Sequence, residues 1–431
     1  MTKSVKASRW TSYRAVLRRR PFLLFFGGSV VSTLGNHFFE LALMWLTFSE
    51  TRSSLKVAAI AVVFQVTYVV VGPAAGVFAD RWDRRRTMIV CDLIRSGLLG
   101  GFIFATFRFG FSFPLALLAV FLLESTGRFF GPSRQAYIPT LVERDQLVTA
   151  NGLLTGIRQA AGLGGQALAG VVIATAGALA AMVIDAVSFV FSAVSLMLIR
   201  PGDAPKPESP VQAPEMSRAR RFWSELREGY RVLAGVPVLR ALLLFAIFEN
   251  AIFAMIEPAM PAYVRTDLHT GAWAYGLVGS FQFAGGLFGG LLAGGLASNL
   301  RAGTLIVATT AFNGGAVIAA GLVHVVPGAL MLWGAWGFSL AVMGVVEQSL
   351  EQALLPSRLL ARVLAMMSSV GMVLMPTGSL LGGFLANRIG AAPLYVLVGA
   401  GFVAASGAIL AHPILRSARL DTEPEEVGAR P

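Results

Sequence analysis

The chain has 431 residues, of which 55% are hydrophobic and only 13% are charged, and its formal net charge is +12. A soluble domain carries about 25% charged residues, so this chain has too few polar groups to cover a surface in water, and most of it must lie in lipid. The basic residues sit in short loops without an aromatic-rich basic patch, which excludes a nucleic-acid-binding protein.

Twelve apolar runs, separated by charged or turn-rich breaks, are each long enough to cross a bilayer as a helix. They lie at 21–48, 55–79, 87–108, 112–133, 147–174, 177–199, 238–265, 271–298, 302–325, 327–351, 359–388 and 391–415. The pattern predicts an all-α membrane protein with twelve transmembrane helices, and no run is flanked like a cleavable signal peptide.

Composition divides the chain into five predicted parts. They are a basic tail at 1–20, a six-helix half at 21–199, a linker at 200–237, a second six-helix half at 238–415 and a second tail at 416–431. The linker is first rich in proline and then spaces Phe222, Leu226 and Tyr230 on one helical face, which predicts an amphipathic helix on the membrane surface. A solvated linker helix is the alternative.

The distribution of basic residues predicts the orientation of the chain. With the N-terminus in the cytoplasm, 27 of the 35 Lys and Arg residues lie in cytoplasmic tails and loops or in the first turns of the spans next to them. Because basic loops are retained on the cytoplasmic side, we expect a multi-pass protein of the bacterial cytoplasmic membrane with both termini inside.

The two halves are related by a sequence repeat. A shift of 217 residues maps span 21–48 onto span 238–265, and Arg134-Gln135-Ala136 onto Glu351-Gln352-Ala353. A parallel repeat of six-helix halves is typical of a transporter that rocks about a site between its halves. The repeat therefore predicts a small-molecule transporter working by alternating access.

The segment "GVFADRWDRRR", Gly76–Arg86, concentrates charge between two apolar runs. It resembles the loop signature of the major facilitator superfamily between the second and third helices, with Asp83 where that signature has a glycine. With "RQAYIPTLVERDQLVTANGL", "DAVSFVFSAVSLMLIR" and "FWSELREGYRVLAGVPVLRALL", it is similar to the branch of drug:proton antiporters that includes macrolide efflux pumps and enterobactin exporters.

The resemblance implies an inner gate, which would latch the two halves together on the cytoplasmic side. Its residues would be Gly76, Asp80, Arg81, Arg84 and Arg85. The alternative is that these arginines only follow the positive-inside rule, but that rule does not account for Asp80. The matching segment of the second half has Ser298 and Asn299 in place of Asp80 and Arg81, so we expect an asymmetric latch.

Charged residues inside the spans are the candidates for proton coupling or the substrate cavity, because an ionised group in lipid is costly unless it serves a pathway. They are Glu40, Glu124, Arg128, Arg158, Glu249 and Glu257. The polar residue Asn36, one turn from Glu40 on the same face, is added to this set. Proton exchange needs a carboxylate that is protonated in one environment and ionised in another, which Glu40, Glu249 and Glu257 suit.

Some of these residues have particular expectations. Glu40 and Glu257 are related by the same shift of 217 residues, so we expect them to face one another across a cavity, with Arg158 as a counter-charge. Glu124 and Arg128 are spaced for an ion pair, either structural or, by resemblance to the fourth-helix signature, involved in proton transfer. Asp92 and Arg95 are expected to support the charged loop, and Asp185 has no assigned role.

The sequence thus predicts a secondary exporter, driven by protons, for drugs or amphipathic secondary metabolites. A siderophore exporter of the enterobactin type is the first alternative, and a non-transporting receptor or assembly factor is the second. We expect a monomer without cofactor or metal site, since the four histidines are scattered and Cys91 is the only cysteine. The absence of phosphate-loop and nucleophile motifs argues against an enzyme.

Overall fold

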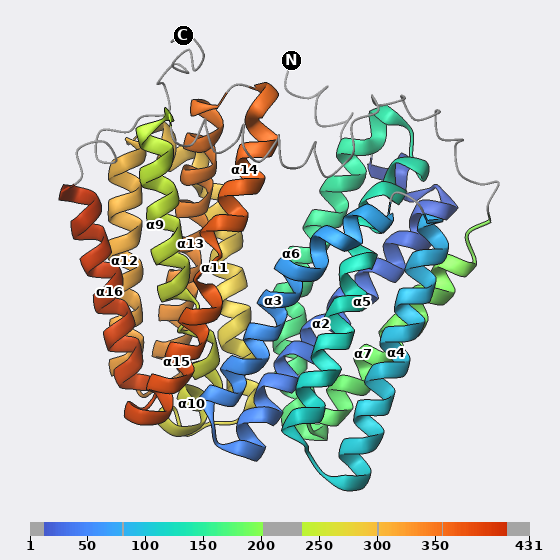
Figure 1. The fold of residues 1–431 in the computed structure, drawn as a ribbon, viewed down its shortest axis with the longest axis horizontal. Coiled ribbons are helices and arrows are strands. Elements are labelled where there is room, and N and C mark those ends of the chain that lie inside the picture. Colours follow the sequence, from blue (N-terminus) through green and yellow to red (C-terminus); the bar gives the residue numbers. More distant parts are fainter. Residues whose placement is uncertain (1–12, 80–81, 201–234, 300, 356, 412–431) are drawn as a thin grey trace. The chain divides into compact units, whose positions relative to one another are not determined.

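The computed structural model describes residues 13–79, 82–200, 235–299, 301–355 and 357–411, and these residues are almost entirely helical (Figure 1). Twelve helical segments among them are long and apolar enough to cross a membrane, which confirms the predicted class. The principal helices are α2 (Arg20–Thr51), α3 (Ser54–Ala79), α4 (Arg84–Phe109), α5 (Phe113–Tyr137), α6 (Leu147–Ala176), α7 (Ala178–Met197), α9 (Pro237–Phe253), α11 (Ala272–Asn299), α12 (Ala302–Leu322), α13 (Val326–Leu354), α14 (Ser357–Gly371), α15 (Met375–Ile389) and α16 (Ala391–Ala411).

The helix ends follow local backbone chemistry. Proline occupies the first turn of α2, α5, α9, α13 and α15, where its missing N–H leaves no bond unmade. Gly110, Gly177 and Gly390 end α4, α6 and α15 with φ of 84°, 87° and 90°, a conformation that residues with a Cβ rarely adopt. Except for Pro376 of α15, these prolines and glycines lie at or next to the breaks between the predicted spans.

Two of the predicted spans are interrupted. After α9, the chain passes through a 3₁₀ turn (Glu257–Ala259), the short α10 (Met260–Ala262) and a π-helical turn (Tyr263–Asp267). Pro258 and Pro261 cannot donate backbone hydrogen bonds, so a regular helix cannot continue there. The eleventh span is likewise divided into α14 and α15 just before Pro376.

Tyr263 anchors the irregular segment. Its hydroxyl donates to the carbonyl oxygens of Ala320 (2.8 Å) and Val323 (3.1 Å), which lie at the end of α12. Its ring packs against Trp333 and Tyr395 in a buried aromatic cluster. The carbonyl groups at the C-terminal end of a helix have no partner within that helix, and here the Tyr263 hydroxyl bonds to those of α12. These bonds fix the interrupted span against α12.

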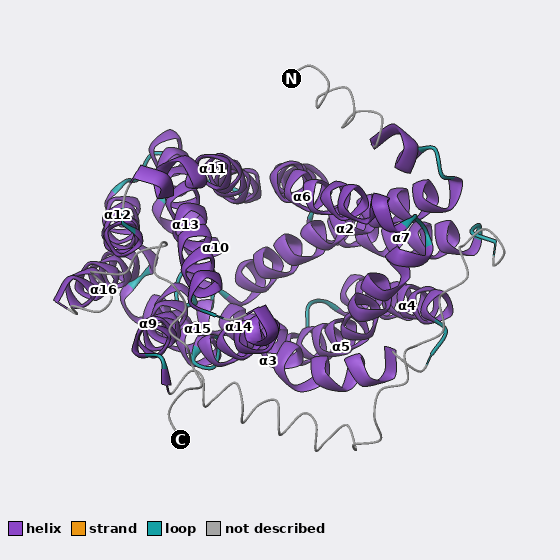
Figure 2. Cartoon of the chain, turned by 90° about the horizontal axis from the view of Figure 1, so that it is seen from above, coloured by secondary structure: helices purple, strands orange, loops and turns teal. Residues whose placement is uncertain are grey.

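The residues fall into two compact units. Within the described ranges, the first unit takes its residues from Met1–Arg52, Ala59–Pro210 and Gly271–Ser280. The second unit takes its residues from Ser53–Ala58, Val211–Thr270 and Phe281–Pro431. In the first, α2 packs on α6 and α7, and α4 packs on α5 and α7; in the second, α12 packs on α13 and α16 (Figure 2).

Small residues bring these helices into close contact. In the second unit, a Cβ added at Gly314 of α12 would lie 2.7 Å from the carbonyl oxygen of Gly399 of α16, so the two backbones touch. In the first unit, a Cβ added at Gly28 of α2 would lie 3.1 Å from Cβ of Ser195 and 3.3 Å from Cα of Ser192, both on α7. Close backbone approach replaces the hydrophobic effect as the source of helix association in lipid.

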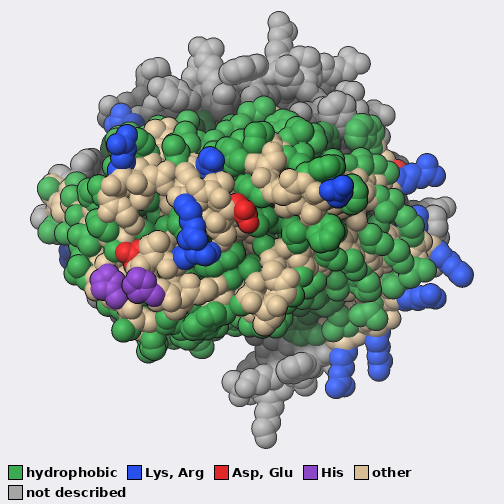
Figure 3. Space-filling view, turned by 90° about the horizontal axis from the view of Figure 1, so that it is seen from below, with side chains coloured by type: hydrophobic (Ala, Val, Ile, Leu, Met, Phe, Trp, Pro, Cys, Tyr) green, Lys and Arg blue, Asp and Glu red, His purple; other side chains and the backbone are tan. Residues whose placement is uncertain are grey.

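The outward faces of the helices are apolar. Phe104, Phe107, Leu291 and Met331 each expose more than half of their surface, as expected for side chains in contact with lipid. The face drawn in Figure 3 is largely hydrophobic, with Lys and Arg side chains at several places and few acidic ones. The predicted linker helix with Phe222, Leu226 and Tyr230, residues 1–12 of the predicted N-terminal tail and the whole C-terminal tail lie outside the described residues.

Candidate functional site

A cavity of about 350 Å³ opens within the first unit, between helices α2, α3, α4 and α5. Its walls are formed by Ser29, Ser32, Thr33, Asn36, Phe39, Glu40, Phe64, Arg95, Glu124, Gly127, Arg128, Phe130, Gly131 and Arg134. Two carboxylates and three guanidiniums thus share the wall with three phenylalanines. Four of the sequence-predicted residues, Asn36, Glu40, Glu124 and Arg128, are brought together here.

Helix α2 contributes Asn36 and Glu40, which lie one turn apart on the same face. The side chain of Glu40 is 43% exposed, and its Oε2 atom lies 4.0 Å from Nδ1 of His37. An acid with this exposure can exchange a proton with water in the cavity. Glu40 therefore has the access that a proton carrier needs.

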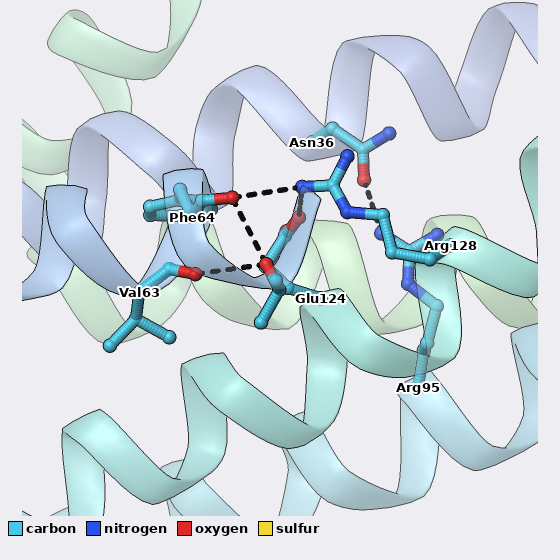
Figure 4. Close-up of polar contacts among 7 residues, drawn as sticks. Asn36, Val63, Phe64, Arg95, Glu124 and Arg128 are labelled. Atoms are coloured by element: carbon cyan, nitrogen blue, oxygen red, sulfur yellow. Dashed lines mark hydrogen bonds and ion pairs between the residues drawn. The ribbon is translucent and has the colours of Figure 1, made fainter. Parts of the chain in front are cut away.

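Helix α5 contributes the pair Glu124 and Arg128 (Figure 4). Arg128 Nη2 donates to Glu124 Oε2 at 2.7 Å and to the backbone carbonyl of Phe64 at 3.2 Å. The two side chains are 18% and 23% exposed, respectively, so the pair is mostly withdrawn from water. The guanidinium also lies 5.2 Å from the ring centre of Tyr68. The predicted ion pair is thus present, and it ties α5 to α3.

Arg95 of α4 was expected to support the charged loop, and this expectation was wrong. Its Nη2 atom donates to Asn36 Oδ1 at 3.0 Å, and its guanidinium lies 3.9 Å from the ring centre of Phe189 (Figure 4). Gly127 of α5 lies beside it, where an added Cβ would be in ordinary van der Waals contact with Cζ of Arg95, at 3.7 Å. Arg95 is therefore part of the cavity wall.

Two further acids lie behind this wall. Asp92 of α4 is fully buried next to Ser192 of α7, and Asp185 of α7 is 1% exposed. Asp185 Oδ1 accepts a hydrogen bond of 3.1 Å from Ser188. Sequence reasoning noted both as charges inside spans but could not place them near Arg95, because hydropathy does not tell which face of α4 meets α7.

The other candidates in the spans lie elsewhere. Arg158 of α6 is exposed and donates to Thr155 of its own helix at 3.2 Å, so it is not among the cavity-lining residues. In the second unit, Glu249 is buried on α9, and its Oε1 atom has no hydrogen-bond partner among the described residues. Glu257 is exposed in the 3₁₀ turn that interrupts the span.

Of the predicted gate, Asp80 and Arg81 lie outside the described residues, and only the helical backbone of Gly76 in α3 is described. Arg84 Nη1 donates to the carbonyl of Ala136 at 2.9 Å, near the end of α5. Arg85 donates to the carbonyls of Leu196 (2.7 Å) and Met197 (2.9 Å) at the end of α7. Arginine at a helix C-terminus donates to the free carbonyl groups there, and its positive charge interacts favourably with the negative end of the helix dipole.

Asp83, which replaces the signature glycine, has a structural function that sequence reasoning missed. Its Oδ1 accepts a hydrogen bond of 2.7 Å from the backbone N–H of Arg86, which caps the first turn of α4. Aspartate is among the preferred residues at this position, so the signal was present in the sequence. The substitution therefore preserves the start of the helix that carries Arg84 and Arg85.

Residues 11–428 match the sequence profile of the transmembrane secretion effectors, a family of the major facilitator superfamily. The chain belongs to this family. Its members are transporters rather than enzymes, and the match extends over nearly the whole chain.

Several curated relatives of the chain are named as efflux proteins. Macrolide efflux protein A of Streptococcus pyogenes is 26% identical over 388 residues, which cover 88% of this chain and 92% of the relative. Multidrug efflux pump Tap of Mycolicibacterium fortuitum is 25% identical over 381 residues, which cover 86% and 91%. These matches support the drug efflux branch of the superfamily.

Solved structures of other transporters share the fold. A bacterial homologue of the human lysosomal transporter Spinster superposes with a TM-score of 0.67 at 14% identity, covering 93% of this chain and 96% of that one. The nucleoside transporter NupG superposes with a TM-score of 0.70 at 11% identity, covering 91% and 99%. At such identities the likeness establishes the fold of this family member and not its substrate.

Proposed function

We propose that this secretion effector exports drugs or amphipathic secondary metabolites in exchange for protons, by alternating access, with both termini in the cytoplasm. The observation that carries the proposal is the first-unit cavity, in which Glu40 and Glu124 share a wall with Phe39, Phe64 and Phe130. Aromatic surface suits the apolar part of an amphipathic cargo, while the carboxylates suit its polar part or a proton. The efflux names of relatives at 26% and 25% identity agree with this cargo class.

The roles of the acids follow from their surroundings. Glu40, at 43% exposure, takes a proton from water when the cavity faces outward and loses it when cargo enters from the cytoplasm. Glu124 is held by Arg128, so in this proposal it positions the guanidinium, and Glu40 carries the proton. Glu249 and Glu257 are candidate proton carriers of the second unit. The loop with Asp80, Arg81, Arg84 and Arg85 would close the cytoplasmic side.

The second candidate, an exporter of enterobactin-type siderophores, is favoured by one observation. Arg95, Arg128 and Arg134 outnumber the two carboxylates of the cavity wall, and such a wall suits an anionic cargo. A macrolide is a bulky amine and would instead rely on Glu40. The two cargo classes therefore make opposite demands on the same cavity, and variants of Glu40 and Arg134 separate them.

The experiment is a resistance and accumulation assay in a bacterial host that lacks its own pumps. Expression of the wild-type chain is expected to raise the inhibitory concentration of erythromycin several-fold and to lower its accumulation, and a protonophore should abolish both effects. Glu40→Gln should lose the effect, and Arg134→Gln should keep it. For the siderophore alternative, secretion of enterobactin is measured in the same host, and secretion that needs the chain, is lost with Arg134→Gln and is kept with Glu40→Gln would support that alternative. Unchanged resistance with the wild-type chain would contradict drug export.

A further inference from the structure

Asp185 is an acid for which the proposed mechanism has no use. It lies on α7 with 1% of its surface exposed, and only Oδ1 receives a hydrogen bond, from Ser188. Its Oδ2 atom has no partner among the residues that the structure describes. An ionised carboxylate in an apolar interior without a paired cation costs several kcal/mol, and such a group takes up a proton instead.

The charges around Asp185 come from two helices. From α4, Arg95 attracts it and Asp92 repels it, and Glu124 of α5 repels it as well. From α2 it is met by the uncharged Gly35, while His37 and Glu40 of that helix lie beside each other. Arg158, the charged residue of α6, is exposed and bonds to Thr155. Among these groups, Arg95 is thus the cation that attracts the ionised form of Asp185.

Arg95 forms no ion pair with Asp92 or Asp185 among the described residues. Its Nη2 atom instead donates a hydrogen bond to Asn36 in the cavity wall. Its Nε atom is buried and has no hydrogen-bond partner among the described residues. The guanidinium rests on the ring of Phe189, which is one turn from Asp185 on α7. It therefore stands between the cavity and the buried acid.

We propose that Asp185 is a proton-binding site behind the cavity wall and that Arg95 transmits its charge to the cargo. The inference rests on the proposed proton-coupled export. When Asp185 is neutral, Arg95 remains on Asn36 and keeps a positive charge at the cavity. When Asp185 releases its proton to water, the guanidinium moves towards the carboxylate, and the bond to Asn36 breaks. The positive charge of Arg95 then balances the negative charge that proton loss leaves on the Asp185 carboxylate.

The packing of Asp185 connects this site to α2. A Cβ at Gly35 would overlap both Asp185 and Ser188, so the backbone of α2 lies directly against the acid. Asn36, the partner of Arg95, is the next residue along α2. A change at Asp185 therefore reaches the cavity by two routes, through the guanidinium of Arg95 and through the backbone at Gly35.

The test measures proton release when erythromycin binds to the purified full-length chain in weakly buffered detergent, followed with a pH indicator dye. The wild-type chain should release protons on binding, and Asp185→Asn should release about one fewer per bound drug. Erythromycin affinity should change with pH less steeply in Asp185→Asn than in the wild type. Asp145→Asn, which neutralises an exposed acid in the 3₁₀ turn before α6, is the matched control, with wild-type release expected.

Arg95→Gln provides a second, independent variant, because it keeps the acid but removes the cation that would compensate its ionisation. It should reduce proton release as Asp185→Asn does. Wild-type release and pH slope in both variants would overturn the inference while leaving proton-coupled export intact. Absence of release from the wild-type chain itself would contradict the proposed proton coupling, and the inference with it.

Discussion

Arg95 and Asn36 are joined by a hydrogen bond of 3.0 Å, which links α4 to α2 in the wall of the cavity. A bond to a charged group contributes about 1.5–3 kcal/mol, so the link is a substantial part of the local stability. It also sets the position of the positive charge that faces a cargo. The predictions below start from this bond and extend to the helices that support it.

Replacement of Asn36 by Ala should release Arg95 from the cavity wall. Because the inference has Arg95 leave the cavity wall when the cationic drug binds, the apparent KM for erythromycin should fall about 5- to 10-fold, with a smaller change in the maximal rate. Asn36→Asp, which keeps an acceptor for Arg95, is the matched control and should not lower the KM. Initial rates of transport in inverted membrane vesicles provide the measurement, and an unchanged KM for Asn36→Ala would contradict this role.

The pair Glu124 and Arg128 should be tested by a double-mutant cycle. Glu124→Gln leaves a mostly buried guanidinium without its counter-charge and should lower the free energy of unfolding by about 2 kcal/mol, less than for a fully buried pair. The double variant Glu124→Gln/Arg128→Gln should be more stable than the sum of the single changes predicts. Thermal unfolding in detergent measures both. Strict additivity would show that the pair contributes nothing by interacting.

The contact of α2 with α7 gives a steric prediction with an internal control. Gly35→Val should lower the melting temperature and the yield of folded protein, because a Cβ there overlaps Asp185 and Ser188. Gly27 lies on the same helix, and a Cβ there would meet nothing within 4 Å, so Gly27→Ala should be tolerated. Equal effects of the two substitutions on thermal stability would mean that α2 and α7 are not packed as described.

The N-cap of α4 predicts the effect of the residue that departs from the family signature. Asp83→Ala should destabilise the start of α4 by about 1 kcal/mol, since the N–H of Arg86 loses its acceptor. Asp83→Asn and the family-like Asp83→Gly should cost only a few tenths of a kcal/mol. Hydrogen exchange at the first turn of α4 is the direct measurement. Slow exchange retained in Asp83→Ala would argue against the cap.

Much of the fold could be predicted from the sequence, because lipid forces long apolar segments to satisfy their backbone groups as helices. The twelve spans and the i,i+4 pair Glu124–Arg128 are local features of this kind. The interruptions near Pro258 and Pro376 were missed, since hydropathy continues through them although the hydrogen bonding does not.

The candidate site could be predicted only in part. The face of α2 with Asn36 and Glu40 follows from helical spacing. The position of the Arg95 side chain depends on Asn36 and Phe189, which lie far away in the sequence and contact its guanidinium. Long-range packing of this kind leaves no local signal. For the same reason, Asp185 could be recognised as buried but not as a neighbour of Arg95.

The central claim is that cargo and protons move in opposite directions through this chain. Purified protein in liposomes that contain a pH-sensitive dye tests it most directly, with the membrane potential clamped and an erythromycin gradient imposed. The account predicts that drug flux in one direction drives proton flux in the other, and that Glu40→Gln loses the proton flux. Drug flux of the wild-type chain without any proton movement would contradict the account.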